Sequence, residues 1–232
     1  MTNAELFLEK YKQLEEAVRT AYNLRNEDSV SFYLTNHNKY RDYVDEIKYC
    51  KEVRNLLSHK KKISNSFAVE PNDNMISFID ELIEKVKNRR KCCEIQVKLS
   101  DVYWQRCDSL VKDCVEVMHK TGYGHVPILD NKGSVAGVFG INSLFSYIAD
   151  NGASALNENL KFSDILEYLA LDTRKSRKII FVKADLYADE LEKQIEKAFK
   201  KGERIVLALV TQNGDPKGKL QGIITPWEII NL

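Results

Sequence analysis

The feature that most constrains this chain of 232 residues is a repeat in its C-terminal part, from about residue 95 onward. Each copy has a helical apolar pattern, a glycine, an apolar strand, an Asn/Gly turn and a second strand with a glycine. One shift of 81 residues pairs four helical apolar positions, Leu110, Cys114, Val117 and Met118, with Leu191, Ile195, Ala198 and Phe199. A repeated unit of this kind buries its apolar face against its neighbour. We therefore expect two half-domains with a ligand-binding cleft between them.

The composition favours a globular protein whose overall charge does not indicate a nucleic-acid-binding protein. Apolar residues make up 44% and charged residues 30% of the chain, which is typical of globular proteins in solution. The net charge of +1 means that any contact with nucleic acid must come from a local patch. The chain has neither an apolar run long enough to span a bilayer nor a signal-like start. We therefore expect a cytoplasmic protein with no membrane partner.

The cysteines argue against a disulfide framework and against a metal site. There are five of them, an odd number, and none is spaced as C-x-x-C. This usage is typical of a reduced compartment. We predict no bound metal.

The first 91 residues predict helices and no strand. Apolar residues recur at helical spacing from Leu6 to Ala21, which indicates one long helix. The patterns favour a short helix at 29–35, a long one from Asn38 to about Lys61, and a third that begins near Asn72. Together they predict an antiparallel helical bundle.

The hydrophobic period changes at Glu94. The segment 94–99 alternates between apolar and polar residues, as a strand does. The remaining patterns predict helices at 108–120, 142–149, 162–169, 189–200 and 226–231, and strands at 125–129, 135–139, 179–182, 204–210 and 220–224. The fold class is therefore α+β.

Two motifs show a family resemblance. The first is Gly122-Tyr-Gly-His-Val-Pro-Ile-Leu-Asp130 with Gly137-Val-Phe139, and the second is Gly222-Ile-Ile-Thr-Pro-Trp-Glu-Ile-Ile230. Residues from about 95 to 232 resemble a tandem CBS pair, or Bateman module. The resemblance implies two βαββα half-domains, which follow the helical bundle predicted for residues 1–91. The first CBS repeat would occupy residues 92–150, and residues 151–232 would form a linker and the second repeat.

The resemblance also implies a regulatory ligand, an adenine nucleotide such as ATP, ADP or AMP. In the second copy, Thr225 would contact phosphate and Glu228 would accept from the ribose hydroxyls. By the same alignment, Arg204 and Ile205 would line the sugar and base slot. The first copy has Gly140 and Ser143 at the positions of Thr225 and Glu228, so we expect one competent site, with His125 and Val126 forming the wall of a weaker one.

The same residues also fit purely structural roles. Thr225-Pro-Trp-Glu228 is consistent with a capping box, with Thr as the N-cap, Pro at the first helical position and Glu at the third. His125 fits a packed strand residue. Trp227 fits a core or interface residue.

A second motif lies in the helical part, at Arg54-Asn-Leu-Leu-Ser-His59. On a helix, Arg54 falls within an apolar stripe made by Tyr40, Tyr43, Val44, Ile47, Cys50 and Leu57. Arg54 and His59 are about 140° apart around the axis. One helix therefore does not easily direct both at one phosphate, whereas two chains related by a two-fold axis could share such a site.

This motif and the helix layout resemble the HEPN family over residues 1–91. The resemblance implies a metal-independent endoribonuclease that acts as a homodimer. Arg54 would stabilise phosphate charge, His59 would act as general base or acid and Asn55 would orient the substrate. The cations that follow, Lys60, Lys61 and Lys62, would guide RNA.

Arg54 and His59 also fit structural roles. Arg54 could form an interhelical ion pair with an acid of the helix at 72–90, and His59 could interact with the helix dipole. We therefore weigh three hypotheses. The first is a nucleotide-sensing regulator with a ribonuclease effector, the second is a non-enzymatic binding module under nucleotide control, and the third is a dimerisation scaffold.

Overall fold

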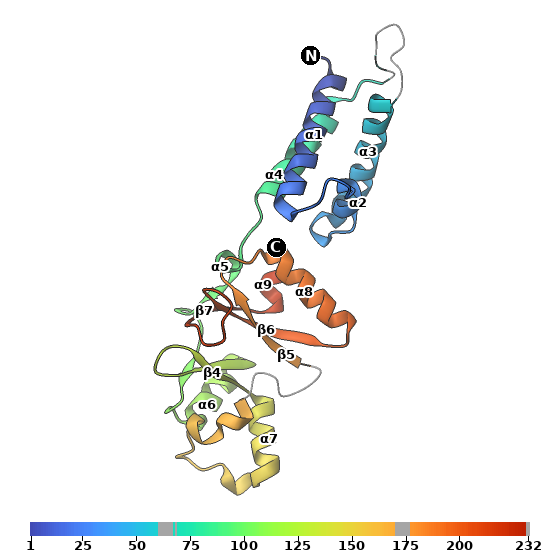
Figure 1. Ribbon diagram of the computed structural model, residues 1–232. Coiled ribbons are helices and arrows are strands. Elements are labelled where there is room, and N and C mark those ends of the chain that lie inside the picture. Colours follow the sequence, from blue (N-terminus) through green and yellow to red (C-terminus); the bar gives the residue numbers. More distant parts are fainter. Residues whose placement is uncertain (60–66, 68, 170–176, 231–232) are drawn as a thin grey trace. The chain divides into compact units, whose positions relative to one another are not determined.

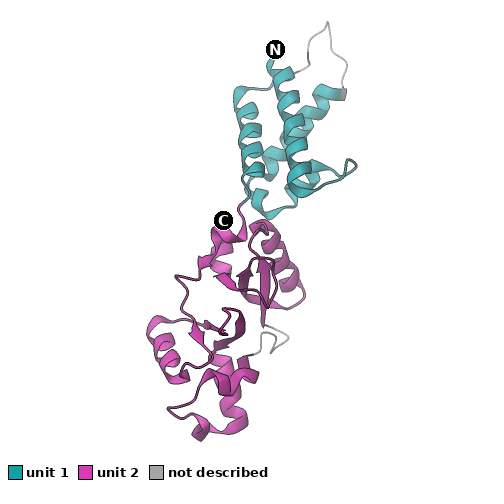
Figure 2. Cartoon of the chain, turned by 60° about the vertical axis from the view of Figure 1, so that its left-hand side comes forward, with its two compact units in different colours: residues 1–89 teal, residues 90–232 magenta. Residues whose placement is uncertain are grey.

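The computed structural model describes residues 1–59, 67, 69–169 and 177–230. The chain divides into two compact units, Met1–Arg89 and Arg90–Leu232, which Figure 2 shows in different colours. The first unit is helical and the second combines helices with two sheets. The predicted α+β class is confirmed.

The first unit consists of the helices α1 (Asn3–Tyr22), α2 (Val30–Thr35), η1 (Asn38–Tyr43), α3 (Val44–His59) and α4 (Asp73–Lys87). Polar side chains set the helix starts. The Thr2 hydroxyl accepts from the Glu5 amide while the Glu5 carboxylate accepts from the Thr2 amide, which satisfies two amides that a helix leaves without partners. Asn72 caps α4 in the same way by accepting from the Met75 amide.

The long helix predicted from Asn38 is divided in two. It begins as the 3₁₀ segment η1, where Tyr40 departs from helical backbone angles, and continues as α3. Tyr40 is fully buried and its hydroxyl lies 2.7 Å from that of Tyr22 on α1. The kink therefore coincides with a packed aromatic contact that the helical period does not reveal.

The helices of the bundle are not all antiparallel, which differs from the expectation drawn from the sequence. The Asn3 amide donates to the Pro71 carbonyl at 3.1 Å and to the Asp73 carboxylate at 2.9 Å, so α1 and α4 begin side by side and run parallel. Helix α3 runs in the opposite direction, since Arg54 near its end contacts Glu15 in the middle of α1 (Figure 1). Apolar residues from all of these helices form one core.

The second unit contains two halves with the same element order. The first half is β2 (Gln105–Arg106), α6 (Val111–Thr121), β3 (His125–Leu129), β4 (Val135–Gly140) and α7 (Ile141–Asn151). After η2 (Ala153–Ala155) and η3 (Phe162–Leu169), the second half is β5 (Arg177–Lys183), α8 (Ala188–Lys200), β6 (Arg204–Thr211), β7 (Leu220–Ile224) and α9 (Pro226–Ile230). This is the predicted βαββα order, given twice.

The two sheets have matching topologies. In the first half, β3 pairs with β2 in parallel and with β4 in antiparallel orientation. In the second half, β6 pairs in the same way with β5 and β7. A further strand, β1 (Val97–Lys98), pairs with β7, so the segment before the first half belongs to the sheet of the second.

The predicted strand at 94–99 is wrong over its first residues. These form the helical turn α5 (Cys92–Ile95). The Cys92 amide donates to the Leu186 carbonyl and the Cys93 amide to the Ala184 carbonyl, and Cys92 is fully buried in the core of the second half. Tertiary contacts therefore decide the local conformation against the alternating pattern.

A shared core joins the two sheets. It contains Leu129 and Val138 from the first sheet and Leu207, Leu209 and Leu220 from the second. The Leu220 amide also donates to the Gly133 carbonyl. The halves therefore form one packed unit.

The helices of the two halves are not related by one constant offset such as the predicted 81. Helix α6 begins at Val111 and α8 begins at Ala188, 77 positions later. Gly122 and Gly202, which follow the two helices with φ angles of 76° and 78°, are 80 positions apart. Phe199, which the shift of 81 matches to Met118, is 67% exposed. Met118 packs against its core and corresponds to the buried Ala198.

Candidate functional site

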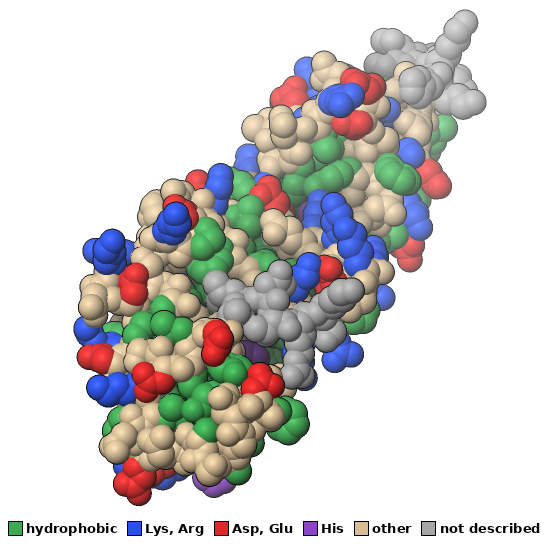
Figure 3. All heavy atoms as spheres, turned by 60° about the horizontal axis from the view of Figure 1, so that its bottom comes forward, with side chains coloured by type: hydrophobic (Ala, Val, Ile, Leu, Met, Phe, Trp, Pro, Cys, Tyr) green, Lys and Arg blue, Asp and Glu red, His purple; other side chains and the backbone are tan. Residues whose placement is uncertain are grey.

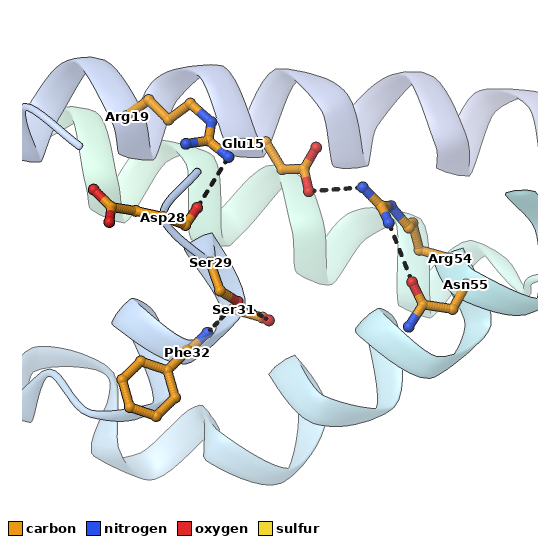
Figure 4. Close-up of polar contacts among 8 residues, drawn as sticks. All are labelled: Glu15, Arg19, Asp28, Ser29, Ser31, Phe32, Arg54 and Asn55. Atoms are coloured by element: carbon orange, nitrogen blue, oxygen red, sulfur yellow. Dashed lines mark hydrogen bonds and ion pairs between the residues drawn. The ribbon is translucent and has the colours of Figure 1, made fainter. Parts of the chain in front are cut away.

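Arg54 of α3 is half-buried and contacts Glu15 and Asn55 (Figure 4). Its Nη2 atom lies 3.0 Å from the Glu15 carboxylate on α1. Its Nη1 atom donates to the Asn55 side-chain oxygen at 3.1 Å. The guanidinium carbon lies 5.6 Å from the centre of the Tyr11 ring, within the range of a cation–π contact.

The expected interhelical ion pair of Arg54 therefore exists, but its acid comes from α1 and not from the helix at 72–90. The two side chains are 32% and 28% exposed. Helical periodicity identifies the face on which Arg54 lies but does not identify the helix that packs opposite that face.

Arg54 and Asn55 line one pocket of about 220 Å³. His59 is the last residue of α3, and its side chain lies outside the described part of the structure, as do Lys60, Lys61 and Lys62.

Thr225 and Glu228 form only one half of the predicted capping box at the junction of β7 and α9, because the Thr225 hydroxyl does not accept from the Glu228 amide. The Glu228 Oε2 atom accepts from the Thr225 amide at 2.7 Å and from the Thr225 hydroxyl at 2.6 Å. The Thr225 hydroxyl oxygen accepts in turn from the Trp227 amide at 3.3 Å. Trp227 itself is 72% exposed, so it is not a core residue.

The other residues assigned to the nucleotide lie at corresponding ends of the two sheets. Arg204 and Ile205 begin β6, and antiparallel pairing brings the start of β6 to the same end of the sheet as Thr225. His125 and Val126 begin β3, and His125 faces Gly140 in the register. Arg204 is exposed, Ile205 and Val126 are buried, and His125 is half-buried.

Arg177 is a candidate residue that the sequence patterns do not reveal. It begins β5 and faces Arg204 in the register. Burial lowers the pKa of His125 below its usual 6.5, and the nearby positive charge of Arg177 lowers it further. His125 is therefore mainly neutral at pH 7, whereas Arg177 and Arg204 are cations at this end of the unit. The one feature of the sequence that could have identified Arg177 is that two strands of the same half each start with an arginine.

A second pocket, of about 340 Å³, lies in the first half. It is lined mainly by apolar side chains from α6, β4 and α7 and the segment before β3, namely Val115, Met118, His119, Tyr123, Gly124, Phe139, Ile141 and Leu144. None of the residues assigned to the nucleotide lines this pocket.

Three of the cysteines, Cys50, Cys92 and Cys114, have buried thiols. All five cysteines are free. Burial raises the pKa of Cys50 and Cys114 to about 11 and that of Cys92 to about 12, which keeps these thiols protonated at neutral pH.

The surface carries charges of both signs. On the face in Figure 3, Lys and Arg side chains are interspersed with Asp and Glu, as the net charge of +1 suggests. Within the described residues, no group of three His, Cys, Asp or Glu side chains is placed to hold a metal ion. None of the described helices has the length and apolar character needed to cross a membrane.

The geometry defines a class of protein built from two matching βαββα halves that share a core, joined to a helical unit. Residues 107–150 match the family model of the CBS domain, so the chain contains a CBS domain. No curated protein matches the chain in sequence.

Several solved structures are similar to the chain. A putative acetoin utilization protein (AcuB) from Vibrio cholerae is 17% identical with a TM-score of 0.46, and the match covers 62% of this chain and 89% of that one. A CBS domain-containing protein of unknown function from Bacillus anthracis has the same identity and TM-score, with 63% and 95% covered. CBSX2, solved in complex with AMP, is 14% identical with a TM-score of 0.44, with 61% and 93% covered.

Proposed function

We propose that the second unit binds an adenine nucleotide (ATP, ADP or AMP) and that this ligand regulates the helical unit. The observation that carries the proposal is the carboxylate of Glu228. Both of its capping contacts use Oε2, and within the described residues Oε1 has no hydrogen-bond or ion-pair partner. A carboxylate oxygen held in this way is a suitable acceptor for ribose hydroxyls.

The surrounding charges support a phosphate-bearing ligand. Arg177 and Arg204 face each other at the end of the sheet where β6 begins, and arginine suits phosphate because its planar donors match the phosphate oxygens. In the first half, Gly140 and Ser143 supply no carboxylate. The proposal therefore assigns one competent site to the second half, with His125 and Val126 near the weaker one.

The test is calorimetric titration of the full chain with ATP, ADP and AMP, comparing the wild type with Glu228→Gln. Glutamine has the size of glutamate, but its one oxygen is needed for the cap, so no acceptor remains for the ribose. Because charge-assisted hydrogen bonds contribute roughly 1.5–3 kcal/mol, we expect at least about tenfold weaker binding.

Ser143→Ala is the matched control, because Ser143 lies at the corresponding position of the first half. We expect it to leave the affinity unchanged. Absence of binding by the wild type, or equal binding by Glu228→Gln, would contradict the proposal.

A second candidate function concerns the helical unit, as a metal-independent endoribonuclease that works as a cytoplasmic homodimer under nucleotide control. It is favoured by one observation, that Arg54 and Asn55 line the same pocket. Arg54 would stabilise phosphate charge, His59 would transfer the proton, and Lys60, Lys61 and Lys62 would guide RNA. A tenfold difference in nucleotide affinity between the active and inactive states, about 1.4 kcal/mol, suffices for a graded response.

The experiment for this candidate is RNA cleavage by the full chain in the presence of a chelator, with and without nucleotide. We expect His59→Ala to reduce the rate at least about a hundredfold, the usual scale of general acid–base catalysis, without lowering the melting temperature. Nucleotide binding without any cleavage would instead support the alternative, a non-enzymatic binding module with a silent helical unit.

A further inference from the structure

The pocket beside Arg54 is polar and lies among three helices of the first unit. Its lining comes from α1, α2, α3 and the segment between α1 and α2, and consists of Tyr11, Glu15, Arg19, Asp28, Ser29, Val30, Ser31, Lys51, Arg54 and Asn55. Its volume of about 220 Å³ is below the roughly 300–1,000 Å³ of pockets for drug-sized ligands. The pocket therefore suits a small polar molecule.

Several hydrogen-bond donors of this lining are not used by the protein. Lys51 is exposed and has no ion-pair partner among the described residues. The Asn55 oxygen accepts from Arg54, so the Asn55 amide nitrogen remains available, again within the described part of the chain. Burial raises the pKa of Tyr11 to about 12, which keeps its hydroxyl protonated. A ligand rich in acceptors would satisfy such donors.

The two acids of the lining have different roles. Asp28 accepts from the Arg25 amide at 2.8 Å, and its carbonyl accepts from Arg19 at 3.1 Å, so it holds the segment between α1 and α2. Glu15 extends from α1 toward Arg54 (Figure 4) and forms the ion pair at 3.0 Å. Glu15 therefore occupies the position at Arg54 that an anion would take.

We propose that this pocket binds the phosphate group of a small phosphate ester, with Arg54, Lys51 and Asn55 as donors and Glu15 as an internal competitor. Binding replaces the Glu15 carboxylate by a ligand oxygen at Arg54. The site belongs to the helical unit alone, and it requires neither the nucleotide site of the second unit nor RNA cleavage.

The competition gives Glu15 and Lys51 opposite effects. Glu15→Gln removes a negative charge from the pocket and frees Arg54, so it should tighten phosphate binding about three- to tenfold. Lys51→Gln removes a cation and should weaken binding about three- to tenfold. If the Glu15–Arg54 ion pair had only a structural role, Glu15→Gln would not increase the affinity of the pocket for an anion.

The experiment is an NMR titration of the ¹⁵N-labelled full chain with inorganic phosphate and with glycerol 3-phosphate at constant ionic strength. Neither probe carries a nucleobase. The outcome therefore does not depend on whether the second unit binds an adenine nucleotide. We expect saturable shifts of the Ser31 and Asn55 amide signals, with tighter binding of the ester. The spectrum also shows whether each variant is folded. If Glu15→Gln does not fold, Arg54→Lys replaces it and should weaken binding because the forked donors are lost.

Two variants serve as matched controls. Glu16→Gln alters an exposed acid on α1 that pairs with Lys12, and Lys48→Gln alters an exposed lysine on α3 that pairs with Asp45. Both should leave the affinity unchanged. The proposal is overturned if the shifts do not saturate, if Glu15→Gln fails to tighten binding, or if only an RNA oligonucleotide binds and neither small probe does.

Discussion

Replacing Gly137 with alanine is expected to destabilise the second unit by about 2–3 kcal/mol, the upper part of the usual range for overpacking. A Cβ atom at this position of β4 would lie 2.5 Å from the Leu169 Cβ atom and 2.7 Å from the Leu169 carbonyl oxygen. The carbonyl belongs to the backbone, so it cannot move away by a change of rotamer. The strand or the end of η3 must shift instead.

The measurement is urea unfolding of the full chain followed by tryptophan fluorescence. Both tryptophans, Trp104 and Trp227, lie in the second unit, so the signal reports on that unit. Gly124→Ala is the control, because a Cβ atom there meets no other heavy atom within 4 Å. Equal stabilities of the two variants would contradict the explanation.

The same argument explains the glycine of the second copy. A Cβ atom on Gly222 of β7 would meet the Val97 carbonyl oxygen and the Gln96 side chain, because β1 pairs with β7 at this point. In each half, therefore, the glycine of the second hairpin strand leaves room for the close approach of a segment from outside the βαββα unit. The sequence repeat contains these glycines, but only the fold shows what they accommodate.

Much of the second unit can be predicted because its strands and helices carry strong local patterns. The patterns place the strands at 125–129 and 220–224 at their observed ends. The predictions fail where contacts distant in sequence decide. The turn at 92–95 is held by backbone bonds to residues 184 and 186, and Phe199 is apolar yet exposed.

The candidate sites are predictable to the extent that they are local. Thr225 and Glu228 are three residues apart, and that spacing alone brings their side chains into contact. The partner of Arg54 is 39 residues away on another helix, and helical periodicity contains no information about which helix packs opposite. Arg177 joins the candidate cluster only through the register of β5 and β6.

Leu209→Ala is expected to destabilise the second unit by about 3–4 kcal/mol, since truncating a buried leucine removes apolar contacts and leaves a cavity. Leu209 of β6 is fully buried in the cluster that contains Leu129 and Val138 from the other sheet. The cavity would therefore open between the two halves. Urea unfolding by tryptophan fluorescence measures the change, and Leu166→Ala, at a position 40% exposed, should change the stability little.

Hydrogen exchange of the Leu209→Ala chain distinguishes a shared core from two independent ones. Because the cluster belongs to both sheets, we expect amide protection to fall in β3 and β4 of the first half as well as in β6 and β7. Loss confined to the second half would contradict this coupling. The coupling matters for the proposed function, because a nucleotide held by Glu228 in the second half can stabilise the first half only through contacts that the two halves share.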